Sequence, residues 1–231
     1  MSDPALERLA ETAAGWGAAL DAAALARLET YLRSVRERNR ETNLTADDSW
    51  DDLVNKHAAD GVLAGAVLRE IVRGRAAGAP RVLDLGSGAG FIGIALKIAW
   101  PQAEVTLMEA VERKFRFLNS AATRVGLPGL RALRRRAGDG APPSSYAAGF
   151  DAVIERALAP LPEAVRLAAP LLAPGGIFAA FQSVPPDADQ PELRSALSRA
   201  RLRSLGSRAY RRPGEAANRA LALFASAPGN G

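Results

Sequence analysis

The sequence predicts an α/β protein in which helices cover both faces of a doubly wound, seven-stranded sheet, with an N-terminal layer of helices. Beyond residue 80, short runs of aliphatic and β-branched residues alternate with stretches of helical periodicity. Before residue 75, the apolar residues recur at helical spacing. The chain has 231 residues, 48% of them hydrophobic, so it can bury the core of one domain with a smaller addition.

Residues 1–77 are expected to form the helical region, and residues 78–231 the Rossmann-like domain. The apolar stripe of the first region recurs at Leu25, Leu28, Leu32 and Val35. A second stripe begins at Leu53 and continues through His57 to Gly61. The segment Gly78-Ala-Pro80 then breaks the pattern before the first strand.

The expected elements of the second region follow in order. Strands are predicted over 81–86, 104–109, 131–136, 151–156, 176–182, 205–211 and 219–226. Helices are predicted over 91–99, 111–125, 160–172 and 189–202. The last two strands follow each other without an intervening helix, which predicts an antiparallel hairpin at the C-terminal end.

The most informative segment is residues 81–93, Arg-Val-Leu-Asp-Leu-Gly-Ser-Gly-Ala-Gly-Phe-Ile-Gly. An apolar strand runs into an acid and then into Gly86, Gly88 and Gly90, which allow the backbone to turn sharply and to lie close to a ligand. This pattern predicts a cofactor site. The register that begins at Gly88 also satisfies the dinucleotide fingerprint, although such a match alone is weak evidence.

Asp84 favours S-adenosylmethionine over a dinucleotide. A carboxylate just before the first glycine would repel a pyrophosphate, whereas S-adenosylmethionine carries an ammonium and a sulfonium. Glu109 supports the same cofactor, because it ends the next predicted strand, where an acid can accept the two ribose hydroxyls. We therefore expect Asp84, Gly86, Gly88 and Glu109 to bind S-adenosylmethionine.

Composition restricts the other chemistry. The chain contains no cysteine, so disulfides, thiolate metal sites and thiol nucleophiles are excluded, and no metal is expected. No apolar run has the length of a membrane span, and Met1-Ser-Asp-Pro does not resemble a signal peptide, which predicts a cytoplasmic protein without a membrane partner.

Arginines supply most of the net charge of +5, and they cluster within residues 131–136 and 194–212. Because arginine pairs with phosphate through a planar fork, these clusters favour RNA as a partner over a merely solvated basic surface.

The possible acceptor atoms for the methyl group of S-adenosylmethionine can be reduced by elimination. Enzymes that methylate carbon 5 of a pyrimidine need a cysteine, which is absent. Enzymes that methylate an exocyclic amine usually have a proline-rich motif after the fourth strand, where this chain has Glu155-Arg156-Ala157. A ring nitrogen such as guanine N7 remains, and its lone pair needs no general base.

The chain resembles the RsmG family, also called glucose-inhibited division protein B, the bacterial small-subunit ribosomal RNA guanine-N7 methyltransferases. The resemblance spans residues 20–225 and rests on Asn43-Leu44-Thr45, Lys56-His57-x-x-Asp60, the segment 84–93, Arg136-Ala137 and Arg156-Ala157. It implies a monomeric class I S-adenosylmethionine-dependent methyltransferase that acts on 16S rRNA or on the assembling small subunit.

The resemblance also assigns roles to residues. It implies that Gly86 and Phe91 contact the cofactor, that Glu109 binds the ribose, and that Arg156 lies at the cofactor end of the pocket. It places the adenine edge against the backbone of Ala137 and Gly138. It makes Lys56, His57 and Asp60 the expected catalytic residues, beside the target base. By spacing alone, the place of His57 on an apolar stripe favours a packing residue over a catalytic one, and only the family box makes the two readings equal alternatives.

Three positions depart from the family pattern. Ile92 replaces a proline, and the acid expected at Gly138 is Asp139 instead. The predicted fifth strand ends in Phe181-Gln182-Ser183, where the family has a Lys-Gly pair. Because this change removes a cation from the substrate side, a diverged small-molecule methyltransferase stays an alternative. Two further alternatives for the function are a non-catalytic RNA-binding module and a nicotinamide oxidoreductase.

Overall fold

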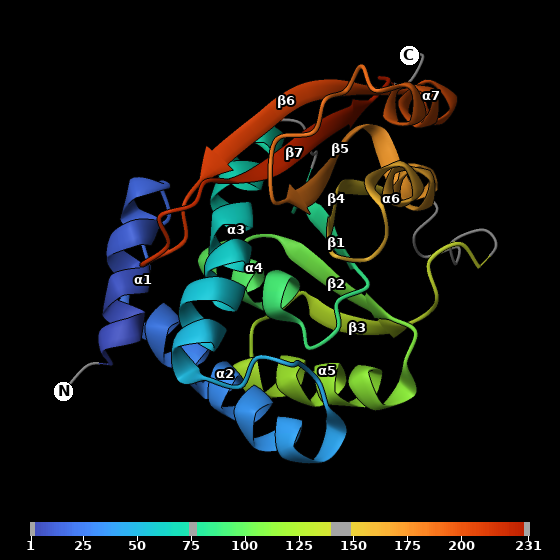
Figure 1. The fold of residues 1–231 in the computed structure, drawn as a ribbon. Coiled ribbons are helices and arrows are strands. Elements are labelled where there is room, and N and C mark those ends of the chain that lie inside the picture. The colour runs from blue at the N-terminus through green and yellow to red at the C-terminus, as the bar shows by residue number, and fades with distance from the viewer. Residues whose placement is uncertain (1–2, 74–77, 140–148, 229–231) are drawn as a thin grey trace.

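The computed structural model describes residues 3–73, 78–139 and 149–228, and Figure 1 shows a single sheet with helices on both faces. The strand order is β3-β2-β1-β4-β5-β7-β6. The strands are β1 (Arg81–Leu85), β2 (Glu104–Glu109), β3 (Leu130–Arg134), β4 (Phe150–Arg156), β5 (Leu172–Gln182), β6 (Leu202–Tyr210) and β7 (Arg219–Ser226). The first five strands are parallel to one another, whereas β7 is antiparallel to β5 and β6. The predicted sheet and the C-terminal hairpin are therefore confirmed.

The helices divide between the two faces of the sheet. The N-terminal helices are α1 (Pro4–Gly15), α2 (Ala22–Thr42), the π-helix η1 (Asp52–Ala58) and α3 (Ala59–Val72). They pack on the side of α4 (Phe91–Ala99) and α5 (Glu112–Val125), as the ribbon shows (Figure 1). The opposite face carries α6 (Leu161–Ala168), the short 3₁₀ helix η3 (Ala169–Leu171) and α7 (Pro191–Ala200).

Buried residues form one hydrophobic cluster on each face of the sheet. Val82 and Ala152 face the N-terminal helices, whereas their strand neighbours Leu83 and Val153 face α6 and α7. Strands buried on both faces explain why the sequence shows nearly continuous apolar runs. The first cluster joins α1, α2 and α3 to the sheet. The predicted boundary at 77/78 lies beside residues 74–77, outside the described residues, and one core extends across it.

Most predicted elements differ from the structure by one to three residues at an end, and the two largest differences have identifiable reasons. The helix expected over 160–172 ends at Ala168, and η3 follows, because Pro170 has no N–H to continue an α-helix. The fifth strand begins at Leu172 rather than 176, since a register shift against Phe150 absorbs the Pro-Gly-Gly segment that reads as a turn. The strand over 104–109, the strand over 219–226 and the helix over 91–99 have the predicted bounds.

The Asn43-Leu44-Thr45 segment ends α2 and redirects the chain toward η1. Asn43 adopts a left-handed conformation with φ of 45°, which an asparagine tolerates at the end of a helix. The side-chain amide of Asn39 binds both the N–H and the C=O of Thr45 at 2.9 and 3.0 Å. Leu44 is buried in the core. This turn fixes the entry of residues 47–58, which carry several site residues.

Candidate functional site

The glycine-rich turn between β1 and α4 forms one wall of a pocket. Gly86, Gly88 and Gly90 have φ values of 76°, 59° and 89°, which side-chain-bearing residues rarely adopt. A Cβ at Gly86 would lie 2.6 Å from a methyl carbon of Leu158. A Cβ at Gly88 would meet nothing within 4 Å, so the backbone there faces open space.

The pocket has a volume of about 710 Å³, which is within the range of sites for small molecules. It is lined by the glycine turn, Glu109, residues 135–139, residues 157–160 and α6. Five of the predicted cofactor residues line it together, namely Gly86, Gly88, Glu109, Ala137 and Gly138. An open glycine backbone and an acid at the next strand end fit an adenosyl group with two ribose hydroxyls.

Glu109 is held in place at the end of β2 by two backbone donors. Its Oε2 accepts the N–H of Gly88 at 2.9 Å, and its Oε1 accepts the N–H of Val111 at 2.7 Å. The residue is 7% exposed. Because a carboxylate has about four acceptor sites, these two bonds orient Glu109 and leave capacity for ligand hydroxyls.

Asp84 lies behind the glycine turn rather than on the pocket wall. Its Oδ2 accepts the N–H of Gly93 at 2.9 Å, which ties the end of β1 to the first turn of α4. Burial raises the pKa of Asp84 to about 6, although this hydrogen bond opposes the shift. A Cβ at Gly93 would lie 2.8 Å from the same oxygen, so glycine is required there.

The predicted residues Phe91, His57 and Arg156 meet beside the glycine turn. The His57 ring stacks on Phe91 with centroids 4.2 Å apart and planes at 13°. The Arg156 guanidinium lies 5.9 Å from the centroid of Phe91, and its Nη2 lies 2.6 Å from Nδ1 of His57. Phe91 is therefore the platform under His57 rather than part of the lining of the pocket described above.

The hydrogen bonds of His57 fix its protonation. An arginine only donates, so Nδ1 of His57 must accept from Arg156. The proton of the neutral ring then lies on Nε2, which donates to Asp47 at 2.8 Å. Burial and then the charge of Arg156 lower the pKa of His57 to about 4. His57 is thus neutral at physiological pH, with both ring nitrogens occupied.

Asp60 has a different position from the one expected. It is 0% exposed, and its carboxylate accepts from Arg156, Tyr210 and Arg212. Burial opposes the charged form, but the hydrogen bonds from Arg212 and the charge of Arg156 outweigh it and lower the pKa of Asp60. The expectation that Asp60 lies open beside a base does not fit this position, because the helical spacing that pairs it with His57 directs it into the core.

Lys56 and His57 share the carboxylate of Asp47. The Lys56 Nζ lies 2.6 Å from Oδ2 of Asp47, and this hydrogen bond is the main reason that the pKa of Asp47 is lowered. About a third of the Lys56 side chain is exposed. The box 56–60 therefore presents Lys56 to the surface, His57 to Phe91 and Arg156, and Asp60 to the interior.

Close packing between α3 and α4 brings this box to Phe91. A Cβ at Gly61 would lie 2.6 Å from the carbonyl oxygen of Ile92 and 2.7 Å from that of Phe91, so only glycine permits the approach. Residues 52–58 form a π-helix, a rare turn that is frequent at functional sites. The wider turn re-aims Lys56 and His57 relative to α3.

Sequence reasoning missed three residues of the site, which are Asp47, Tyr210 and Arg212. Arg212 was counted among the surface arginines of 194–212, yet it is 7% exposed and pairs with Asp60. The sequence signal for them was the string Tyr210-Arg-Arg-Pro213, in which a proline follows the end of β6.

Two residues that differ from the family pattern also have defined positions. Gln182 donates to the carbonyl of its neighbour Phe181 at 2.8 Å. Ile92 is buried in the first turn of α4.

The described part of the chain contains neither a cluster of metal-binding side chains nor a membrane-spanning helix. In residues 3–73, 78–139 and 149–228, no group of three or more His, Cys, Asp or Glu side chains could hold a metal ion. None of the helices in these ranges is both long and apolar enough to cross a membrane.

Comparison with known proteins assigns the chain to a family. The family described as rRNA small subunit methyltransferase G matches residues 24–208. A ribosomal RNA small subunit methyltransferase G of Myxococcus xanthus is 36% identical over 199 residues, covering 86% of this chain and 87% of the relative. Another from Geobacter sp. strain M21 is 37% identical over 182 residues, covering 79% of each chain. The chain belongs to this family.

Solved structures support the fold. The 1,6-didemethyltoxoflavin-N1-methyltransferase of Burkholderia thailandensis has a TM-score of 0.55 at 19% identity, covering 86% of this chain and 90% of its own. The magnesium protoporphyrin IX methyltransferase of Synechocystis has a TM-score of 0.52 at 16% identity, covering 85% and 97%. The predicted class I methyltransferase fold is confirmed.

Family membership also settles the class of enzyme. The protein is a methyltransferase that uses S-adenosylmethionine and acts on ribosomal RNA, as the sequence predicted. A small-molecule enzyme, a non-catalytic module and an oxidoreductase are not favoured. The roles of single residues stay predictions.

If Glu109 binds the ribose, Glu109→Gln weakens S-adenosylmethionine binding about 10- to 100-fold, because a charge-assisted hydrogen bond contributes about 1.5–3 kcal/mol. Isothermal titration calorimetry measures this affinity. Glu104→Gln is the control, since Glu104 begins the same strand at its opposite end. Equal affinities of the two variants would contradict the assignment.

The buried Glu155 predicts a pH-dependent stability. It is 0% exposed, its Oε2 accepts the N–H of Leu158 at 3.0 Å, and its Oε1 has no partner among the described residues. Burial raises its pKa from the ordinary value of 4.5 to about 7. The folded protein thus holds an extra proton in this window, and the stability that it contributes is lost as pH rises through about 7.

We expect the free energy of unfolding of the wild type, relative to Glu155→Gln, to fall by on the order of 3 kcal/mol between pH 4.5 and 7. Urea unfolding at a series of pH values measures the difference. Glu163→Gln serves as an exposed control and gives a flat difference. A flat difference for Glu155→Gln as well would show that Glu155 is ionised throughout.

Proposed function

We propose that this enzyme transfers a methyl group to N7 of a guanine in 16S rRNA. The observation that supports this acceptor is that His57 and Asp60, the two residues of the 56–60 box that could remove a proton, have all their acceptor atoms engaged. The chain also contains no cysteine that could attack a pyrimidine ring. Guanine N7 presents a lone pair and loses no proton, so it needs neither group.

The binding roles follow from the pocket. Glu109 would hold the ribose hydroxyls, and the backbone at Ala137 and Gly138 would face the adenine edge. Asp84 would hold the glycine turn against the first turn of α4 by accepting the N–H of Gly93. When bound, S-adenosylmethionine supplies the methyl group as a sulfonium.

On the substrate side, we assign Arg156 and His57 to the base and Lys56 to the adjoining RNA backbone. Arg156 keeps 19% of its side chain exposed, and Lys56 keeps 36%. A neutral His57 presents a flat ring without adding a cation beside a base that becomes positive on methylation. Asp60 takes a positioning role, because it contacts Arg156 and is closed to solvent.

The exposed arginines at the end of β6 would contact RNA phosphates. Arg208 and Arg211 are exposed next to Tyr210, which reaches the site, and β6 ends beside α1 and α3 (Figure 1). The pair of Arg208 with Glu70 at 3.3 Å is exposed and contributes little. A cytoplasmic monomer acting on naked RNA or on the assembling subunit is part of the proposal.

Replacing Arg208 and Arg211 by glutamine flattens the salt dependence of RNA binding by about one to two units of log–log slope. The reason is that binding without these two phosphate contacts releases fewer counterions from the RNA. Filter binding over a salt series measures this slope. The control, Arg194 and Arg199 replaced together, removes the same charge from α7 on the other face of the sheet. If both variants flatten the slope equally, net charge rather than the end of β6 accounts for binding.

Mass spectrometry of nucleosides identifies the acceptor. The protein is incubated with S-adenosylmethionine and either naked 16S rRNA or small subunits from cells that lack it, and the rRNA is digested. We expect 7-methylguanosine at one position. A methyl group on carbon 5, on an exocyclic amine or on a ribose 2′-oxygen would overturn the proposed acceptor.

A further inference from the structure

The segment that follows β6 inserts a second guanidinium into the cluster around Asp60. Arg212 Nε donates to Oδ1 of Asp60 at 2.9 Å, and Arg212 Nη2 donates to Oδ2 at 2.6 Å. This two-bond fork is the geometry in which arginine binds a carboxylate most specifically. Arg156 reaches the same carboxylate through Nη1 alone, at 2.8 Å.

We propose that Arg212 and Tyr210 are positioning residues of the methyltransferase, which occupy Asp60 so that Arg156 keeps one amino group for His57. This inference rests on the proposed function, in which Arg156 and His57 face the substrate. Nothing in the family comparison assigns a role to either residue.

The acceptor capacity of Asp60 is the first argument. A carboxylate offers about four lone-pair sites. Oδ1 receives Tyr210 Oη at 2.7 Å together with Arg212 Nε, and Oδ2 receives Arg212 Nη2 together with Arg156 Nη1. These four bonds fill the sites. Arg156 is therefore limited to one bond with Asp60, and its Nη2 is free to donate to Nδ1 of His57 at 2.6 Å.

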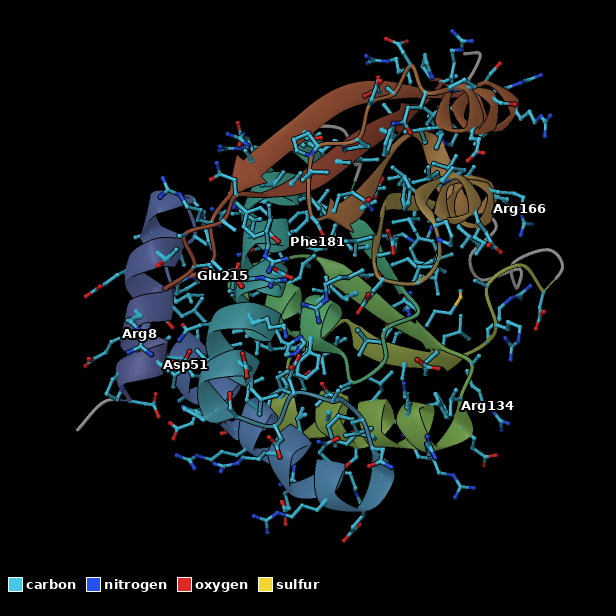
Figure 2. The ribbon with its side chains drawn as sticks, in the orientation of Figure 1. Arg8, Asp51, Arg134, Arg166, Phe181 and Glu215 are labelled. Atoms are coloured by element: carbon cyan, nitrogen blue, oxygen red, sulfur yellow. The ribbon has the colours of Figure 1, made fainter. Side chains whose placement is uncertain are left out.

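Charge gives the second argument. Arg212 also lies 3.3 Å from Glu215, which in turn pairs with Arg219 at 2.7 Å. The positive charge of Arg212 is thus neutralised by two carboxylates, Asp60 and Glu215. The positive charge of Arg156 has only Asp60, which it shares with Arg212. Figure 2 shows Glu215 between α1 and α3, on the segment that carries Arg212 toward the site. The incompletely neutralised cation is Arg156, which is also the more exposed guanidinium, at 19% against 7% for Arg212.

Aromatic packing holds the donors in place. The Tyr210 ring meets Phe181 of β5 edge-on with centroids 6.1 Å apart, and it meets Trp16 beyond α1 at 6.2 Å. Tyr210 is 6% exposed. The position of its hydroxyl is therefore set by three segments of the fold, as a rigid positioning group requires.

Removal of the fork has a definite consequence. With two acceptor sites of Asp60 vacated, the Arg156 guanidinium can close on both oxygens and withdraw Nη2 from His57. Nδ1 of His57 then loses the donor that opposes its protonation. The groups that face the ring are Arg156, Asp47, Lys56 and Phe91, so Asp47 would favour the protonated form.

The experiment exploits the fact that His57 is the only histidine in the chain. Nitrogen NMR of the histidine-labelled protein reports one imidazole, without RNA or cofactor. In the wild type we expect a neutral ring protonated on Nε2 across pH 5.5–7.5. In Arg212→Gln we expect the pKa of His57 to rise by at least about one unit toward its ordinary value near 6.5, with mixed tautomers.

Milder variants keep the test decisive if Arg212→Gln does not fold. Arg212→Lys retains the charge but cannot form the fork, and Tyr210→Phe removes one donor and nothing else. Each should raise the pKa of His57 by a smaller amount. Arg211→Gln is the matched control, since the neighbouring residue is exposed and carries the same charge, and it should leave the His57 signals unchanged. Unchanged His57 signals in folded Arg212→Lys and Tyr210→Phe would overturn the proposal.

Turnover separates this inference from the proposed function. In Arg212→Lys we expect kcat to fall about 10- to 100-fold with unchanged S-adenosylmethionine affinity, because Arg156 and His57 are misplaced. A loss of turnover with an unperturbed His57 would overturn the positioning role and leave the guanine assignment intact. A different methylated nucleoside in the wild type would overturn the guanine assignment, while the His57 measurement would still stand.

Discussion

The buried carboxylate of Asp60 is the constraint on which the arrangement of the site depends. A charge with 0% exposure is tolerated only if donors surround it, and removing one partner of such a group typically costs about 3–5 kcal/mol. Its donors come from the end of β4, the end of β6 and the segment after β6. Asp60 therefore joins the N-terminal helical layer to two strand ends, in addition to the hydrophobic cluster that the layer shares with the sheet.

Local signals explain how much of the fold could be predicted. The strand at 104–109 and the helix at 91–99 have alternating or helical apolar patterns that end at clear breaks, and their bounds agree with the structure. The start of β5 was misplaced because Pro174-Gly175-Gly176 favours a turn, whereas pairing of Leu172 with Phe150 extends the strand beyond it. Long-range pairing overrides local preference in such cases.

The site residues, too, divide into those that local sequence predicts and those that long-range contacts determine. Gly86, Gly88 and Glu109 were predictable because adjacent parallel strands end at one edge of the sheet, and the structure brings them into one pocket. The partnership of Asp60 with Arg212 spans 152 positions, and nothing in the local sequence announces it. The spacing of His57 and Asp60 predicted a shared helical face but not which part of that face is buried, because burial depends on what packs against it.

A single physical requirement connects the two halves of the site. Methyl transfer to a ring nitrogen moves positive charge from the donor to the base, so a histidine that gained a proton beside that base would oppose the reaction. Burial and then Arg156 keep His57 neutral, and we propose that Arg156 is available because Arg212 and Tyr210 complete the shell of Asp60. By this proposal, the C-terminal hairpin contributes through Asp60 and Arg156 to the neutral state of a residue in the N-terminal helical layer. The position of His57 on Phe91 depends in turn on Gly61, because a side chain there would collide with the carbonyl oxygens of Phe91 and Ile92 and separate α3 from α4.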